Sequence, residues 1–221
     1  MDIKDSLNYM SHFKKILKPV YRGAINFLKW NRRIGLKYTD FSIISNNCAG
    51  GYIYQYYGIS YKTPTEGIGM SVDDYLKLIR NPKYYFSQDL EFVNPESTER
   101  YESGEHFTYP AAKISDITVY FRHYPTKEVA EDKWKRRSSR INYQRMFFLL
   151  SESETMREEH VAAFNRILHN TNSKGALLTT KFKPKDNAHL IDSVPIIKGV
   201  PQWKPSIILS CLNWKKIINS L

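Results

Sequence analysis

Cys48 is the side chain best suited to covalent chemistry by its type and its neighbours. It follows a short apolar run and lies in the segment Ser45-Asn46-Asn47-Cys48-Ala49-Gly50-Gly51. This order predicts a strand, a sharp turn and the start of a helix. A thiol in the first turn of a helix lies at the positive end of the helix dipole, which favours the reactive thiolate. We therefore identify Cys48 as a candidate nucleophile; the alternative is a small buried side chain beside glycines that let the backbone turn.

A nucleophilic thiol needs a base, and His123 is the candidate. It follows the alternating apolar residues of 117–121, so it lies near the end of a predicted strand, where α/β folds place their functional crevice. It could remove the Cys48 proton and later protonate the leaving group. Asn142 and Asp116 are candidates to orient the imidazole, and Asp116 is the weaker one because it precedes the strand. The alternative for His123 is a surface or structural histidine.

Groups that could stabilise an oxyanion surround Cys48 in the sequence. They are the side-chain amides of Asn46 and Asn47 and the backbone N–H groups of residues 49 and 50. We count Gly50 and Gly51 with the asparagines among the candidate substrate-binding residues. All of them could instead be simple turn residues. The glycine pair has neither phosphate-loop nor dinucleotide-binding spacing.

Arginines on a predicted helix at 127–141 could bind an anion. Trp134, Arg137 and Ile141 recur on one face, so we expect Arg137 to point into the domain, where it needs an anion or an acceptor. The ligand would be a phosphate or carboxylate of a sugar, bound with Arg140. The alternative is a structural ion pair beside a solvated basic face.

Tyrosines are concentrated between residues 52 and 85. Their rings and hydroxyls suit sugar rings, which have both C–H patches and polar edges, and we include Tyr54 among the candidate substrate-binding residues. Tyrosines also simply fill cores and interfaces.

Short blocks spread over most of the chain carry a family resemblance. They are Ser45–Gly51, Ile53–Gln55, Tyr61–Thr65, Asp74–Lys77, Tyr84–Tyr85, Tyr109–Pro110, Asp116–Ile117, His123–Tyr124, Trp134 and Arg137–Asn142. In these blocks the chain resembles an uncharacterised bacterial family of exopolysaccharide biosynthesis proteins, a domain of unknown function often encoded among capsule and lipopolysaccharide genes. The chain departs from that family after residue 150, where Ser151–Glu154 replaces an acidic Asp-Arg-Asp loop.

The resemblance implies biosynthesis or modification of a bacterial surface polysaccharide. With Cys48 as nucleophile and His123 as base, the expected activity is a cysteine-dependent O-acyl transfer to a glycan or a lipid-linked sugar. The acyl donor would be a molecule such as acetyl-CoA, and we expect no tightly bound cofactor.

Two other functions remain open. A glycosyl- or phosphotransferase would use Arg137 and Arg140 with a carboxylate such as Asp74 or Asp116, and Cys48 would then be structural. A non-catalytic assembly factor at the membrane would need none of these side chains for turnover.

The N-terminal 37 residues differ from the rest of the chain. They carry nine basic and two acidic residues, a net charge of +7 out of the total of +11. Apolar residues at 13, 16, 17, 20, 24, 27 and 28 follow helical spacing, and Pro19 would start or kink such a helix. A basic amphipathic helix suits an anionic membrane surface, and the alternative is a helix packed on the domain. We predict an extension at 1–37 and one α/β domain at 38–221.

Other classes of protein fit the sequence poorly. We see no run long enough to span a bilayer and no signal peptide, so we expect a cytoplasmic protein that binds peripherally at the inner face of the cell membrane. Cys48 and Cys211 cannot form a disulfide framework, and no spacing indicates a metal site. Basic proteins often bind nucleic acid, but no pattern for that partner is present.

Short apolar runs alternate with helical stretches, which is typical of an α/β fold with a mainly parallel sheet flanked by helices. Residues 81–115 look irregular, and 203–221 could form a closing helix or a second membrane contact. A capping box at Thr155 and Glu158 would begin the fourth helix. The predicted strands are 41–46, 117–122, 145–150, 176–180 and 194–197, and the predicted helices are 49–57, 71–80, 127–141 and 155–168.

Overall fold

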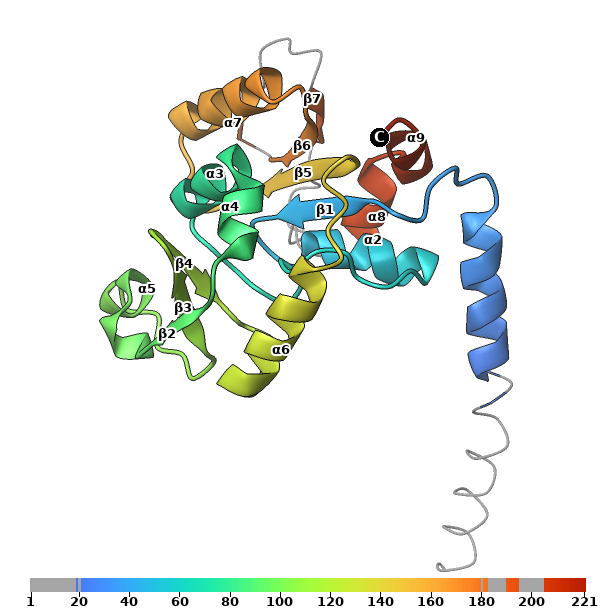
Figure 1. The fold of residues 1–221 in the computed structure, drawn as a ribbon. Helices are drawn as coiled ribbons and strands as arrows, with labels where there is room; N and C mark the ends of the chain where they lie inside the picture. Colours follow the sequence, from blue (N-terminus) through green and yellow to red (C-terminus); the bar gives the residue numbers. More distant parts are fainter. Residues whose placement is uncertain (1–18, 20, 180, 183–189, 195–204) are drawn as a thin grey trace, which may run out of the picture.

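Four parallel strands form the centre of the molecule, in the order β1-β5-β6-β7 (Figure 1). The computed structural model describes residues 19, 21–179, 181–182, 190–194 and 205–221, with the backbone alone for 190–194. Every residue of β1 is buried, as expected for a strand that helices cover on both faces. The predicted α/β fold with a mainly parallel sheet is confirmed. The strands are β1 (Ser42–Ser45), β5 (Met146–Ser151), β6 (Lys174–Leu178) and β7 (Leu190–Val194).

Helices cover both faces of the parallel sheet. Ile43 and Phe147 face α2, α8 and α9, whereas Ile44 and Phe148 face α3 and α7. Successive side chains of a strand point to opposite sides, so each short apolar run contributes to two cores. The helices are α2 (Ala49–Tyr57), α8 (Pro205–Cys211), α9 (Trp214–Asn219), α3 (Val72–Arg80) and α7 (Glu158–Asn170).

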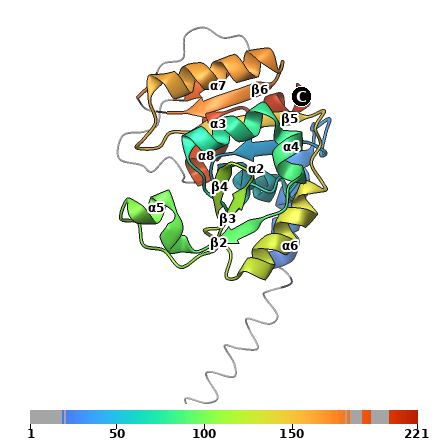
Figure 2. The ribbon, with the colours of Figure 1, turned by 60° about the vertical axis from the view of Figure 1, so that its left-hand side comes forward.

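A second, antiparallel sheet, β2-β3-β4, lies below the parallel sheet in both views (Figures 1 and 2). A backbone bridge between Gly69 and Tyr120 ties it to the segment before α3. Trp134 of α6 packs in the same core as the apolar residues of β3 and β4. The elements of this region are α4 (Pro82–Ser87), β2 (Glu91–Val93), η1 (Pro95–Ser97), α5 (Glu99–Glu102), β3 (Ala111–Ile114), β4 (Ile117–Tyr120) and α6 (Lys127–Ser138).

This second sheet changes two sequence-based expectations. The strand expected at 117–122 is β4, but it pairs with β3 in a tight hairpin and not with the parallel strands. Ser115 adopts a φ of 57° in the hairpin turn. Glycine or asparagine is the usual residue in this conformation, so the serine gave no signal for a tight turn in the sequence. The stretch 81–115, expected to be irregular, forms α4, β2, η1, α5 and β3.

Helix ends also differ from the prediction. The capping box at Thr155 and Glu158 is wrong, because α7 begins at Glu158 with Arg157 as its cap. The backbone N–H of Arg157 donates to Nδ1 of His160 (3.0 Å), so a histidine takes the role expected of a carboxylate. The C-terminal segment forms two short helices, whose Trp214 is buried against the sheet. Of the strand expected at 194–197, residues 195–197 lie outside the described residues.

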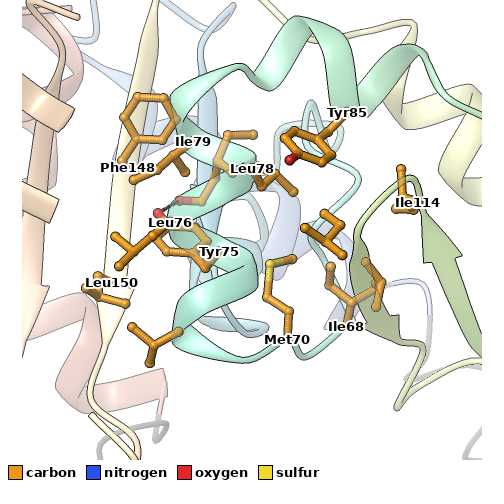
Figure 3. Close-up of a cluster of buried hydrophobic side chains, with 14 of the residues drawn as sticks. Ile68, Met70, Tyr75, Leu76, Leu78, Ile79, Tyr85, Ile114, Phe148 and Leu150 are labelled. Carbon is orange, nitrogen blue, oxygen red and sulfur yellow. Dashed lines mark hydrogen bonds between the residues drawn. The ribbon is translucent and has the colours of Figure 1, made fainter. Parts of the chain in front are cut away.

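Helix α3 joins the two sheets through an apolar core (Figure 3). Its buried residues lie between Phe148 and Leu150 of β5 on one side and Ile114 of β3 on the other. The Tyr75 hydroxyl donates to the carbonyl of Ile44 (2.9 Å), which fixes α3 to the end of β1. The two sheets therefore share one continuous core.

Residues 21–33 form a helix that projects from the domain (Figure 1). Residues 24, 27 and 28 of the predicted apolar stripe lie on it and are exposed; 13, 16, 17 and 20 lie outside the described residues. Across the described part of the chain, every helix is too short or too polar to cross a membrane.

Candidate functional site

Cys48 lies where the sequence predicted it, between a strand and a helix. β1 ends at Ser45, and Cys48 is the N-cap residue of α2, although its side chain makes no capping hydrogen bond. The thiol is half-buried, and its Sγ lies 3.8 Å from the hydroxyl oxygen of Tyr52, one turn further along α2. The thiol is thus placed at the start of a nine-residue helix, next to a phenol.

The backbone N–H groups expected as oxyanion donors are engaged within the turn itself. The side chain of Asn47 accepts a hydrogen bond from the backbone N–H of Ala49 (2.9 Å). The hydroxyl of Ser45 accepts one from the N–H of Gly50 (3.2 Å). The N–H of Gly51 donates to the carbonyl of Cys48 (3.0 Å). These contacts stabilise the turn, and a ligand would have to displace them before it could use the donors.

Asn46 and Tyr54 serve the fold in this structure. The amide of Asn46 donates to the carbonyl of Ser151 and accepts from its N–H, both at 2.9 Å, which joins the ends of β1 and β5. Tyr54 is fully buried; its hydroxyl donates to the carbonyl of Phe41 (3.1 Å) and accepts from the N–H of Ile43 (2.9 Å). Neither side chain is open to a substrate.

His123 lies in the turn after β4 and is exposed. Its backbone N–H donates to the carbonyl of Gly67 (3.1 Å), so the backbone lies near the segment that follows α2. Within the described residues, its imidazole makes no hydrogen bond or ion pair with Cys48. The expected thiol–imidazole pair is therefore not formed.

The two candidate orienting groups lie elsewhere. Asn142 is at the amino ends of β1 and β5, where its side chain donates to Asp40 (2.9 Å). Asp116 is in the β3–β4 turn and is exposed; it accepts from the Tyr85 hydroxyl (2.8 Å) and pairs with Lys77 (3.1 Å). The hydrogen bond from Tyr85 holds the pKa of Asp116 below its usual value. Neither group can orient His123 from these positions.

A carboxylate that we did not single out in the sequence, Glu66, packs against the first turn of α2. A Cβ added to Gly51 would lie 1.4 Å from its Oε2, so only glycine leaves room for this carboxylate. Oε2 is buried and has no hydrogen-bond partner in the described part of the chain. Burial raises the pKa of Glu66 to about 7, against the opposing charge of Arg137. Such an acid can give or take a proton near neutral pH.

The backbone of Glu66 is held rigidly. Its carbonyl accepts hydrogen bonds from Nη1 of Arg137 (2.9 Å) and from the hydroxyl of Tyr124 (2.5 Å). Nη1 of Arg137 also donates to that hydroxyl (2.6 Å), and the guanidinium lies 4.7 Å from the ring centre of Tyr61. Arg137 is only 8% exposed, so its predicted inward orientation is confirmed. Arg140 is exposed and lies instead near Asn142.

Tyr52 is close enough to both the Cys48 thiol and the Glu66 carboxylate for each of them to affect the pKa of its hydroxyl. Burial, together with the neighbouring Cys48 and Glu66 side chains, raises the pKa of Tyr52 to about 12. The phenol therefore keeps its proton at neutral pH and can donate a hydrogen bond.

We call Cys48, Tyr52, Tyr61, Glu66, Tyr124 and Arg137 the Cys48–Glu66 cluster. It lies at the carboxyl end of β1, the edge at which parallel sheets bind their ligands. A second carboxylate, Glu152, follows β5 at the same edge and accepts from the Thr179 hydroxyl (2.5 Å). Among the described residues, no group of three or more His, Cys, Asp or Glu could hold a metal ion. The cluster offers a thiol, an acid of near-neutral pKa and a buried cation.

Comparison with known proteins gives a family but no activity. The sequence profile of a family described as "Domain of unknown function (DUF1919)" matches residues 19–199. An uncharacterized protein of Haemophilus influenzae (strain ATCC 51907 / DSM 11121 / KW20 / Rd) is 27% identical over 160 residues, which cover 72% of each chain. The range matched by the profile contains the whole Cys48–Glu66 cluster.

Proposed function

The chain belongs to the DUF1919 family, and we propose that it transfers an acyl group through Cys48 to a hydroxyl group of a bacterial surface glycan. The sequence resemblance to exopolysaccharide biosynthesis proteins and the bacterial origin of the relative support the substrate class. The observation that carries the chemistry is the Glu66 carboxylate, which packs on the helix turn that bears Cys48 and has one unpartnered oxygen.

In the first half-reaction, Glu66 takes the thiol proton of Cys48, and the Tyr52 hydroxyl lies 3.8 Å from the sulfur. The thiolate attacks the carbonyl carbon of an acyl thioester, a new C–S bond forms, and the C–S bond of the donor breaks. The donor thiolate leaves with the proton from Glu66. We assign this base to Glu66 and not to His123, because Glu66 packs on the helix turn that bears Cys48 and burial raises its pKa to about 7, whereas His123 is exposed in the turn after β4.

In the second half-reaction, the glycan hydroxyl attacks the acyl-cysteine. Glu66 takes the hydroxyl proton, the C–S bond to Cys48 breaks, and the thiolate recovers a proton from Glu66. The enzyme returns to its starting protonation state and the glycan gains an ester. An acid with a pKa near 7 suits both directions of proton transfer.

Intact-protein mass measurement after incubation with acetyl-CoA tests this proposal. We expect an acetylated protein in the wild type and in Cys211→Ser, and none in Cys48→Ala. Cys211 is a matched control because burial raises the pKa of its thiol to about 11, so it should stay unreactive. Equal acetylation of Cys48→Ala would contradict the proposal.

A second candidate function rests on Arg137. Within the described residues only its Nη1 has hydrogen bonds, so the other guanidinium nitrogens are available to a phosphate. A glycosyl- or phosphotransferase would then use Glu66 to deprotonate the acceptor, and Cys48 would be structural. Thermal stabilisation by nucleotide sugars that is kept in Cys48→Ala and lost in Arg137→Gln would favour this function.

The N-terminal helix supports a peripheral location at the inner face of the membrane. Two of its basic residues contact the domain: Arg32 donates to the carbonyl of Tyr56 (3.2 Å), and Lys29 packs on Gly58. Phe27 and Trp30 are 63% and 55% exposed. A helix packed on its own domain would bury its apolar side, so the exposure of these rings supports a membrane contact.

Sedimentation with vesicles tests the membrane contact. Phe27→Ser with Trp30→Ser should weaken binding to anionic vesicles about tenfold or more. In the wild type both rings leave water and enter the membrane interface, and this favourable transfer is lost in the variant. Tyr84→Ser removes an exposed aromatic residue far from this helix and serves as the control. Equal binding of all three proteins would contradict the location.

A further inference from the structure

Two adjoining cavities form a groove at the amino ends of the parallel strands, opposite the Cys48–Glu66 cluster. Their volumes are about 400 and 440 Å³, within the range of ligand pockets. They share Lys83, Tyr143 and Gln144, so they form one depression. We call it the amino-edge groove, and its cationic side chains are Lys83, Arg140, Arg145 and Lys174.

Within the described part of the chain, none of these four cations makes an ion pair with a carboxylate at 4.0 Å or less, although Lys174 donates a hydrogen bond to the Ser220 carbonyl. Aromatic rings hold two of them instead: Lys83 lies 5.6 Å from the ring centre of Tyr143, and Arg145 lies 4.1 Å from that of Tyr38. Four positive charges therefore line one depression, whose lining contains one acidic side chain, Asp40.

The acidic residue that lines the groove, Asp40, already has partners for its carboxylate. It pairs with Lys62 (2.5 Å) and accepts a hydrogen bond from the side chain of Asn142 (2.9 Å). The hydrogen bond from Lys62 keeps the pKa of Asp40 below its usual value. Asp40 therefore stays ionised beside Lys62, with a weaker influence from Arg145, and Lys83 and Arg140 remain available to an external anion.

The groove adjoins the base of the N-terminal helix. The segment after that helix is bound to α9, because the N–H of Lys37 donates to Asn219 (2.7 Å) and the Asn219 amide donates to Gly35 (2.8 Å). The next residue, Ser220, lines the groove. The basic groove and the exposed apolar helix therefore lie next to each other, so one membrane surface can reach both.

We propose that the amino-edge groove binds the phosphate headgroup of an anionic membrane lipid. This inference rests on the proposed membrane location and adds a specific ligand class to it. The phosphate oxyanion would accept hydrogen bonds from Arg140 and Arg145 and share the charge of Lys83 and Lys174. With the apolar side of the helix in the membrane interface, the bound headgroup would fix the orientation of the domain on the bilayer.

Vesicle binding by the full chain tests this inference. The groove variant is Lys83→Gln with Arg140→Gln, two exposed positions, and the charge-matched control is Lys113→Gln with Arg136→Gln. Each basic residue near an anionic surface contributes about 1 kcal/mol, or about fivefold in affinity. The groove variant should therefore bind anionic phospholipid vesicles about thirtyfold more weakly than the wild type, and the control less than threefold. A parallel titration with inorganic pyrophosphate measures binding of the free anion.

Several outcomes would overturn the inference. Equal loss in the groove variant and the control would show a general charge effect and no site. Loss in the Phe27→Ser, Trp30→Ser protein but not in the groove variant would leave the membrane location intact and remove the groove from it. Pyrophosphate binding without vesicle binding would assign the groove to a soluble phosphate compound.

Discussion

The two ends of the parallel sheet hold cations in opposite ways. At the carboxyl end, Arg137 is buried and its Nη1 is bound to a carbonyl and a phenol, next to a buried carboxylate. At the amino end, Lys83 and Arg140 are exposed. Buried, hydrogen-bonded groups hold fixed positions, which chemistry requires, whereas exposed cations suit a charged surface that need not be positioned closely. The contrast agrees with the two proposals, which place the reaction at the carboxyl edge and membrane attachment at the amino edge.

The largest expected effect comes from Gly51→Ala. The new methyl group would displace the Glu66 carboxylate, so we expect acetyl transfer to fall about 100-fold while the fold is kept. Acetylation kinetics and circular dichroism measure both. In a Glu66→Ala background the same change should have almost no further effect, because no carboxylate remains to be displaced. An additive loss would contradict the assigned role of Glu66.

The second prediction concerns stability against pH in Glu66→Gln. The folded-state pKa of about 7 exceeds the ordinary value of 4.5, so the folded protein binds more protons than the unfolded chain between these values. The wild type should therefore lose stability as pH rises from about 4.5 to 7. The variant avoids this loss and should be about 2 kcal/mol more stable at pH 8, but nearly equal at pH 4. Urea unfolding at both pH values checks it, and a constant difference would exclude the shift.

Tyr124→Phe should have a smaller effect. It removes the hydroxyl that donates to the Glu66 carbonyl and accepts from Arg137, so the free energy of unfolding should fall by about 1 to 2 kcal/mol. The rate of acetylation should also fall, because the turn that carries Glu66 loses the hydrogen bond that holds its carbonyl. Tyr84→Phe, at an exposed tyrosine, is the control for thermal unfolding. An equal change in stability in Tyr124→Phe and Tyr84→Phe would contradict the role of the Tyr124 hydroxyl in positioning Glu66.

The smallest effect belongs to the amino edge. The groove variant Lys83→Gln with Arg140→Gln should change the free energy of unfolding by no more than about 0.5 kcal/mol, since both side chains are exposed and unpaired within the described residues. Denaturant titration measures it. A fall of several kcal/mol in the free energy of unfolding would show that these cations stabilise the fold, and the two edges would then not differ in the way described.

Local patterns in the sequence were enough to predict the start of the site. The apolar run before Cys48 and the glycines after it predicted the strand, the turn and α2, which are all present. Helical spacing with Trp134 predicted the inward orientation of Arg137. Both depend on neighbours within about one or two helical turns, and short-range periodicity reports such neighbours well.

Glu66 could not be identified in this way, because its role arises from contacts far apart in the chain. The carboxylate packs on Gly51, and the carbonyl binds Arg137, 71 residues away. A local signal was present: Pro64 and Gly67, with a φ of 76°, mark a tight turn around it. Nothing in that turn indicated that the Glu66 side chain would be buried against Gly51.

The separation of His123 from Asn142 has a similar cause. The prediction treated β4 as part of the parallel sheet, whose strand ends would meet at one edge. The hairpin with β3 places β4 in the second sheet, and Asn142 lies at the amino ends of β1 and β5. Spacing along the chain gives no account of which sheet a strand joins.

The amide of Asn46 acts as one more peptide group at the end of β1. It makes two hydrogen bonds to the backbone of Ser151, which extend the contact between β1 and β5 beyond the last strand residue, while its own carbonyl is left to accept from Met70 (3.1 Å). The chain can therefore turn towards Cys48 without leaving the end of β5 unpaired. Deamidation of Asn46 would replace an N–H donor by an oxygen that faces the Ser151 carbonyl. The contact between the ends of β1 and β5, next to the turn that carries Cys48, would then be weakened.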